Sequence, residues 1–209
     1  MHPAAGLLFS YVAGSFPSAY LAGRVVKGVD LRTMGSGNLG ATNVYRNLGA
    51  PWAIVVLLLD AAKGALPVHF LPHFLDVDAG AGDGALWWAL AFGLAAIAGH
   101  AKPVFLLWKG GGKGVATASG VFAVLVPGAV LTTTLFCALV VWRSGYMSAG
   151  SVSAALLFPL LVWMERGTSP VLWVSLIVSA FICWTHRSNL QRLRAGTETR
   201  LFPKAERQS

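Results

Sequence analysis

Residues 115–142, VATASGVFAVLVPGAVLTTTLFCALVVW, decide the fold, because these 28 residues carry no charge. As one α-helix they would extend about 42 Å at 1.5 Å per residue. That length exceeds the ~30 Å hydrocarbon core of a bilayer. Pro127-Gly128 lies near the middle, and such a pair is typical of a turn. We therefore expect two short spans, of about 13 residues each, that form a hairpin near Pro127.

The rest of the chain is also too apolar for a soluble domain. Of 209 residues, 56% are hydrophobic and 11% charged, whereas soluble domains carry about 25% charged residues. The same composition excludes a disordered chain. Five further apolar stretches lie at about 4–23, 51–72, 85–99, 151–164 and 169–185. Together with the hairpin they predict an all-α integral membrane protein with seven transmembrane helices, in a single domain over 1–209.

Charge sets the orientation of the chain, because loops rich in Lys and Arg face the cytoplasm. The basic segments are 23–50, 100–114 and the tail, and the acidic segment 73–84 holds Asp76, Asp78 and Asp83 without Lys or Arg. If 115–142 crosses twice, every basic segment lies inside, Arg143 included. The sequence therefore predicts an N-terminus outside, a Pro127 turn outside and a C-terminal cytoplasmic tail at about 187–209.

The formal net charge of +8 then belongs to loops that face anionic membrane lipid, and we expect no nucleic-acid partner. The polar, Gly-rich segments all fall on the cytoplasmic side of this map, so we expect the active site there. Cys137 and Cys183 lie inside apolar runs. No Cys, His or Glu cluster has metal-ligand spacing, and we expect neither a metal nor a cofactor.

The first segment suited to chemistry is 35–49, GSGNLGATNVYRNLG. Its glycines expose backbone N–H groups, its Ser, Asn and Thr residues add neutral hydrogen-bonding groups, and Arg46 adds a cation that can bind in a bidentate manner. Those are the components of a phosphate cradle. The alternative is an ordinary membrane loop with glycine turns, since short glycine patterns discriminate weakly.

The second segment is 99–117, in which Lys109 and Lys113 bracket three glycines just before an apolar run. A helix that begins near Gly114 would direct its free N–H groups and its positive dipole end at the anion that the lysines bind. A Walker A loop needs Ser or Thr after the lysine, and Gly114 stands there instead. The pattern favours phosphate binding over an NTPase or a plain basic loop.

Two later segments add polar side chains. Ser148 opens the next span, although serines at a helix start are often simple caps. His186 and Asn189 are three positions apart, at i and i+3, and share one helix face, although the segment could equally be a basic helix at the lipid surface. Asp60 and Lys63 have the same spacing within the second span, where charged groups must pair. A structural ion pair is at least as good an interpretation there as a catalytic one.

Four segments, in this order, resemble the bacterial acyl-phosphate:glycerol-3-phosphate acyltransferase family, PlsY. They are Gly35–Gly49, Gly99–Thr117, Tyr146–Ala155 and His186–Glu198, and Asp60 with Lys63-Gly64 also matches. The resemblance implies a multi-pass enzyme of the bacterial plasma membrane that transfers a fatty acyl group from acyl phosphate to the sn-1 hydroxyl of glycerol 3-phosphate. The products would be lysophosphatidic acid and phosphate, in an early step of phospholipid synthesis. It also suggests the soluble enzyme that makes acyl phosphate as a partner.

The resemblance further implies two sets of site residues. Residues expected to hold acyl phosphate and stabilise developing charge are Ser36, Gly37, Asn38, Lys113 and Ser148. Residues expected to bind glycerol 3-phosphate and orient its hydroxyl are Arg46, Lys109, His186 and Asn189. Thr42 and Asn43 are expected to bind substrate as well, and Glu198 either to do so or to orient an Arg or Lys. Catalytic roles are expected for Ser36, Lys113, Ser148 and His186.

The sequence leaves the proton acceptor and the effect of two departures from the family pattern undecided. The proton acceptor is either His186, whose intrinsic pKa is near 6.5, or the leaving phosphate itself. The chain also departs from the family pattern, with three glycines instead of two between the lysines, and with Gly145 where a basic residue often precedes the Tyr. Arg143 stands two residues before Gly145. A rival function is a small transporter or channel for a phosphorylated metabolite, since glycine-broken helices and buried charges suit one.

Overall fold

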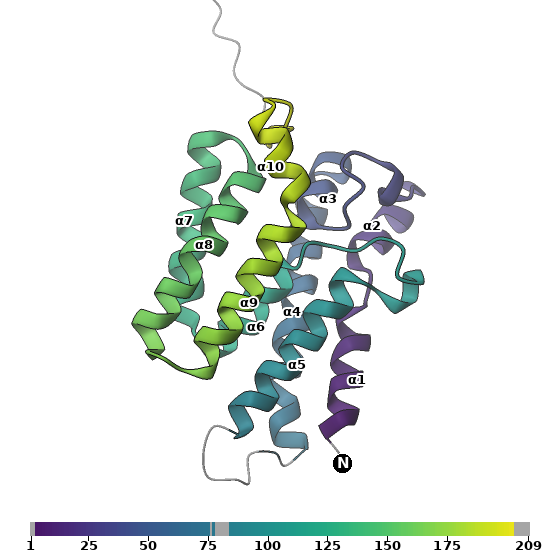
Figure 1. The fold of residues 1–209 in the computed structure, drawn as a ribbon. Coiled ribbons are helices and arrows are strands. Elements are labelled where there is room, and N and C mark those ends of the chain that lie inside the picture. The colour runs from purple at the N-terminus through teal and green to yellow at the C-terminus, as the bar shows by residue number, and fades with distance from the viewer. Residues whose placement is uncertain (1–2, 76, 78–83, 203–209) are drawn as a thin grey trace, which may run out of the picture. The chain divides into compact units, whose positions relative to one another are not determined.

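The computed structural model describes residues 3–75, 77 and 84–202, and its regular structure over these ranges is entirely helical (Figure 1). The chain divides into two compact units, Met1–Pro127 and Gly128–Ser209. The first unit contains α1 Pro3–Gly14, α2 Ser18–Lys27, η1 Leu31–Thr33, α3 Ala41–Leu48, α4 Ala50–Phe74, α5 Gly84–Ala101, η2 Val104–Leu106 and α6 Val115–Leu125. The second contains α7 Pro127–Ser144, α8 Met147–Arg166, α9 Pro170–Thr185 and α10 Arg187–Arg194.

Most of the predicted spans correspond to single helices. The stretches predicted at 51–72, 85–99, 151–164 and 169–185 become α4, α5, α8 and α9. Among the described helices, four are long and apolar enough to cross a bilayer, or five if the bent pair α9–α10 is one span. The all-helical membrane class is therefore confirmed, and the count of seven spans stays a prediction.

The break predicted inside 115–142 is present. α6 ends at Leu125 and α7 begins at Pro127, because proline has no N–H to continue the ladder and disfavours helical geometry in the residue before it. The two parts differ in length from the prediction, since α6 has 11 residues and α7 has 18. The difference arises because α7 continues through Arg143 to Ser144 before Gly145 adopts a left-handed conformation, with φ of 78°.

The prediction of one helix over 4–23 is wrong. The chain leaves the helix after Gly14 and resumes it at Ser18, since Pro17 again cannot donate to the helical ladder. The interruption lies beside α4 and α5 in the first unit, and it places backbone carbonyls where buried side chains can reach them. The acidic residues Asp76, Asp78 and Asp83 lie outside the described residues, as do Lys204 and Arg207.

Small residues let the helices of the first unit approach closely. A Cβ added at Gly14 would overlap the Ala96 backbone of α5, and one added at Gly120 would overlap the Ala61 backbone of α4. Such contacts are typical of membrane helices, which pack through small residues because lipid supplies little hydrophobic driving force. They fix α5 and α6 against their neighbours, and these two helices carry the second glycine-rich segment between them.

Candidate active site

Asn43 organises the first glycine-rich loop from inside. Its side chain is 1% exposed. Its Nδ2 donates to the carbonyls of Leu31 and Met34, both at 3.1 Å, and its Oδ1 accepts from the Ser36 N–H at 3.2 Å. Each polar atom of the amide is therefore engaged within the protein, so this geometry gives Asn43 the task of shaping the loop.

Two left-handed glycines present Ser36. Gly35 and Gly37 have φ of 56° and 68°, a region that side chains with a Cβ rarely adopt. A Cβ at Gly35 would also overlap the Asn43 amide oxygen. The resulting tight loop leaves Ser36 exposed and runs through Asn38 into α3, whose eight residues begin after Gly40.

The second glycine-rich segment is hydrogen-bonded to the first. Leu39 N donates to the Gly111 carbonyl at 3.1 Å, and Gly112 N donates to the His100 carbonyl at 3.1 Å. Arg32 donates to the Lys109 carbonyl at 3.2 Å. The fold thus joins the two predicted segments, although about 70 residues separate them in sequence.

Two helices begin at these loops. α3 follows Gly40, and α6 follows Gly114, with no side-chain cap at either start. Lys113 directly precedes the α6 cap, and Arg46 lies in the last turn of α3. Helix starts with exposed N–H groups and nearby cations favour bound anions. The first unit therefore carries eight predicted site residues on the two connected loops and on α3, which follows the first of them: Ser36, Gly37, Asn38, Thr42, Asn43, Arg46, Lys109 and Lys113.

A salt bridge stiffens the entry to this region. Arg32 and Asp30 pair at 2.7 Å, and the hydrogen bond from Arg32 lowers the Asp30 pKa to about 2 despite some burial. Sequence reasoning missed this pair, although the alternation of opposite charges at 30 and 32 was a usable signal. The pair holds η1 in place, and η1 supplies the Leu31 carbonyl that Asn43 binds.

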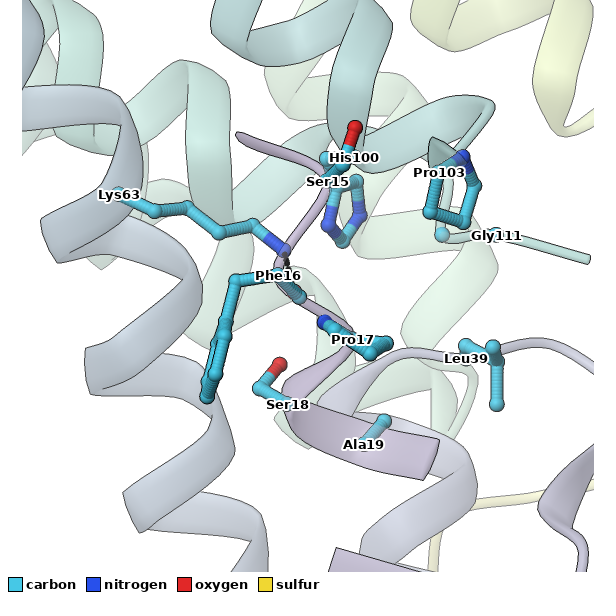
Figure 2. Close-up of a pocket in the computed structure, with 11 residues that line it drawn as sticks. Ser15, Phe16, Pro17, Ser18, Ala19, Leu39, Lys63, His100, Pro103 and Gly111 are labelled. Carbon is cyan, nitrogen blue, oxygen red and sulfur yellow. Dashed lines mark hydrogen bonds between the residues drawn. The ribbon is translucent and has the colours of Figure 1, made fainter. Parts of the chain in front are cut away.

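The predicted pair within α4 is confirmed. Lys63 Nζ lies 2.8 Å from Asp60 Oδ1, and both side chains are buried. Ser18 also donates to Asp60 Oδ1, at 2.6 Å. Figure 2 shows Lys63 and Ser18 beside a small pocket that His100 and Gly111 also line.

Glu198 is the centre of the second unit's polar cluster. Its Oε1 accepts from Ser148 Oγ at 2.8 Å and from Asn189 Nδ2 at 2.6 Å. Its Oε2 accepts from Arg192 Nε at 2.8 Å. Burial would raise the Glu198 pKa, but these three hydrogen bonds outweigh it and hold the pKa below the ordinary value. The expected partnership of Glu198 with an arginine is present, and the partner is Arg192.

His186 is buried at the junction of α9 and α10, where it is 4% exposed. Its Nδ1 lies 2.8 Å from the Ile182 carbonyl. A carbonyl can only accept, so this bond places the ring proton on Nδ1 and leaves Nε2 as the nitrogen that can accept from a hydroxyl. Ser148, His186, Asn189 and Glu198 are the four predicted site residues of the second unit.

The cation beside Tyr146 comes from the tail. The Arg200 guanidinium lies 5.0 Å from the Tyr146 ring centroid, and Leu201 N donates to the Gly145 carbonyl at 2.7 Å. Arg200 therefore stands next to the position where a basic residue precedes the tyrosine in the family pattern. Sequence reasoning considered only Arg143, because nothing in the spacing indicates that the tail folds back.

The comparisons with known proteins agree with one another. A family model described as glycerol-3-phosphate acyltransferase matches residues 4–196. A glycerol-3-phosphate acyltransferase of Synechococcus sp. (strain CC9902) is 46% identical over 96% of this chain and 96% of its own. One of Parasynechococcus marenigrum (strain WH8102) is 47% identical over 95% of this chain and 90% of its own.

Solved structures show the same similarity. One is the crystal structure of PlsY (YgiH), an integral membrane glycerol 3-phosphate acyltransferase, in its glycerol 3-phosphate form. It has a TM-score of 0.83 and 34% identity, over 96% of both chains. The lysophosphatidic acid form has a TM-score of 0.83 and 33% identity, over 95% of this chain and 94% of that one.

The Glu198 cluster predicts a pH dependence of stability. Its lowered pKa contributes stability that is present above the ordinary value of 4.5 and is lost as pH falls through the folded pKa. Glu198→Gln should lower Tm at pH 7 by about 3–10 °C, because hydrogen bonds to a charged acceptor weaken. It should also flatten the fall of Tm between pH 7 and 3. Thermal unfolding of both proteins in detergent across this range provides the test, and parallel pH curves would contradict it.

Proposed function

The chain belongs to the glycerol-3-phosphate acyltransferase family, and from that premise we propose that its acyl donor is acyl phosphate and its acceptor is glycerol 3-phosphate. It is an acyltransferase of phospholipid synthesis. The products of the proposed reaction are lysophosphatidic acid and inorganic phosphate. Membrane lipid surrounds the enzyme and takes up the product.

The observation that carries the proposal is the connected pair of glycine-rich loops. Leu39 and Gly111 join them by a backbone hydrogen bond, each loop leads into a helix start, Lys113 directly precedes the start of α6, and α3 carries Arg46 in its last turn. Two phosphate-bearing substrates require two such cradles. Neutral hydrogen-bonding groups between the cations suit phosphate esters, whose oxygens accept many short contacts.

The proposed roles follow the chemistry of each group. In the first unit, residues that hold acyl phosphate and stabilise its developing charge are Ser36, Gly37, Asn38 and Lys113, and residues that contact glycerol 3-phosphate are Thr42, Arg46 and Lys109. Asn43 acts by shaping the loop that presents Ser36. In the second unit, Ser148 acts on acyl phosphate, and His186 and Asn189 on glycerol 3-phosphate. Glu198 orients Ser148, Asn189 and Arg192.

The reaction needs no covalent enzyme intermediate. Acyl phosphate is a mixed anhydride, so the glycerol hydroxyl oxygen can attack its carbonyl carbon directly. A new C–O ester bond forms, the bond from the carbonyl carbon to the phosphate oxygen breaks, and the hydroxyl proton leaves with the phosphate. Lys113 and the loop N–H groups stabilise negative charge on the carbonyl oxygen and the departing phosphate.

The proposal is tested by product formation. Purified protein in detergent receives acyl phosphate and radiolabelled glycerol 3-phosphate, and lysophosphatidic acid is measured. The proposal predicts steady formation of labelled lipid and release of phosphate. Labelled lipid from acyl-CoA but none from acyl phosphate would overturn the proposal that acyl phosphate is the acyl donor. No labelled lipid from either donor would favour the rival transporter, which makes none.

Lys113→Ala removes one cation from the proposed phosphate cradle. A hydrogen bond to a charged group is worth about 1.5–3 kcal/mol, so kcat/KM should fall about 10- to 150-fold. Lys102→Ala is the matched control, because Lys102 belongs to the same loop but is exposed and precedes the glycines. Full activity of folded Lys113→Ala protein would remove Lys113 from the site.

The leaving phosphate, in this proposal, accepts the proton, and His186 binds and orients glycerol 3-phosphate. His186→Asn keeps hydrogen-bonding ability but cannot titrate near neutrality. It should therefore keep measurable kcat and raise mainly the KM for glycerol 3-phosphate. A general base would instead contribute about 10²–10⁴-fold to the rate. Steady-state kinetics at saturating substrate decide, and a thousandfold loss of kcat with unchanged KM would make His186 the base.

We propose that the chain crosses a bacterial plasma membrane seven times with the active site on the cytoplasmic side, where the soluble enzyme that makes acyl phosphate can reach it. Single cysteines replace Thr168 or Ala195, both exposed, in a chain without Cys137 and Cys183. An impermeant thiol reagent on intact cells should label position 168 and not 195. The reverse pattern would indicate one crossing fewer.

A further inference from the structure

A buried polar cluster holds the interruption between α1 and α2. Asp60 on α4 is 1% exposed and accepts from Ser18 Oγ at 2.6 Å and Lys63 Nζ at 2.8 Å. Lys63 Nζ also donates to the Phe16 carbonyl at 2.9 Å, as the dashed line in Figure 2 shows. The Phe16 carbonyl thus accepts from Lys63 Nζ as well as from the Ser18 N–H, at 3.1 Å, so the ion pair is bound to the backbone at the interruption.

His100 connects this cluster to the second glycine-rich segment. Its Nδ1 lies 3.7 Å from Asp60 Oδ1, and the residue is 6% exposed. Its carbonyl accepts from Gly112 N. The far side of its ring occupies the space beside Gly112, where an added Cβ would overlap Nε2 and Cε1. One edge of the imidazole thus lies near the buried Asp60 carboxylate, and the opposite edge packs against Gly112. We call this second contact the seat of Gly112.

The contact between His100 and Gly112 restrains the short segment between Lys109 and Lys113. Only Gly110–Gly112 separate Lys109 from Lys113. Gly111 is held by Leu39 N, and Gly112 by the His100 carbonyl and ring. With these contacts the segment has little freedom to slide, so the spacing of the two lysines depends on where His100 stands.

The energetics favour a role beyond packing. Burying charged groups at membrane depth is costly, and apolar residues of similar size would stabilise a helix bundle at least as well. The Asp60 and Lys63 charges and the His100 ring are therefore expected to provide a fixed geometry that apolar contacts would not. Through the His100 carbonyl and ring, this cluster contacts Gly112 of the proposed phosphate cradle.

We propose that His100, oriented by Asp60, is a positioning residue that seats Gly112 and thereby sets the placement of Lys109 and Lys113 for the phosphate substrates. The kinetic part of this inference rests on the proposed function. The structural part, the seating of the 109–114 segment, does not.

His100→Asn keeps the contact of residue 100 with Asp60 and removes its contact with Gly112. The asparagine amide keeps a donor on the Asp60 side, so the buried charge retains a partner and the protein should fold. The ring that contacts Gly112 is lost. We expect the KM for at least one phosphate substrate to rise about tenfold or more, with a smaller change in kcat. His69→Asn is the matched control, because His69 is an exposed histidine on α4.

A double-mutant cycle tests the contact itself. Gly112→Ala alone should raise KM, because its Cβ collides with the ring. In His100→Asn/Gly112→Ala the space is free, so the double variant should be better than the product of the two single effects. Independent, multiplying effects would overturn the proposal, as would an unchanged KM in both single variants. If His100→Asn does not fold, His100→Gln takes its place in the cycle.

Hydrogen–deuterium exchange supplies a readout without catalysis. In His100→Asn, peptides that cover 109–114 should exchange faster, while those from 50–74 stay as in the wild type and His69→Asn. Unchanged exchange over 109–114 would overturn the seating. If wild type and His69→Asn make no lysophosphatidic acid while exchange over 109–114 still accelerates, the proposed function fails and the seating stands.

Discussion

The structure depends on one constraint, which is that a bilayer core offers no partner to a polar group. Pro17 interrupts the first helix, and a buried side chain of α4 binds the backbone at the interruption. Lys63 donates to the Phe16 carbonyl, and Asp60 balances the lysine charge. The ion pair is therefore bound directly to the backbone at the interruption. Together with the hydrogen bond from Ser18 to Asp60, this contact holds the start of α2 against α4.

Glycine has two uses in the first unit, and the two are linked. At Gly14 and Gly120 it lets helix backbones touch, which fixes α5 and α6. At Gly112 it leaves room for the His100 ring, which is carried by the end of α5. The packed end of α5 thereby restrains the glycine-rich loop at 109–114, which would otherwise be among the most flexible parts of the chain. A site built from backbone N–H groups needs such support, since preorganised donors are effective only when they do not have to rearrange.

The second unit uses a carboxylate to organise a basic environment. Glu198 accepts from a serine, an asparagine and an arginine, and these bonds keep it ionised although it is partly buried. An acceptor of this kind sets the orientation of donors that would otherwise rotate freely. Arg200 adds a cation over Tyr146 from the same tail. The tail after α10 is therefore a folded part of this unit up to Leu201.

The sequence by itself determined the membrane class, most helix positions, the break at Pro127 and the Asp60–Lys63 pair. These follow from local rules, because apolar length, proline geometry and an i,i+3 spacing act within a few residues. The break at Pro17 was not predicted, because the apolar stretch 4–23 continues through the proline. Only the tertiary structure decided that Leu39 bonds Gly111, that His100 seats Gly112 and that Arg200 stands beside Tyr146. The first and the last of these join residues far apart along the chain, and all three depend on how helices and loops pack, which no local spacing encodes.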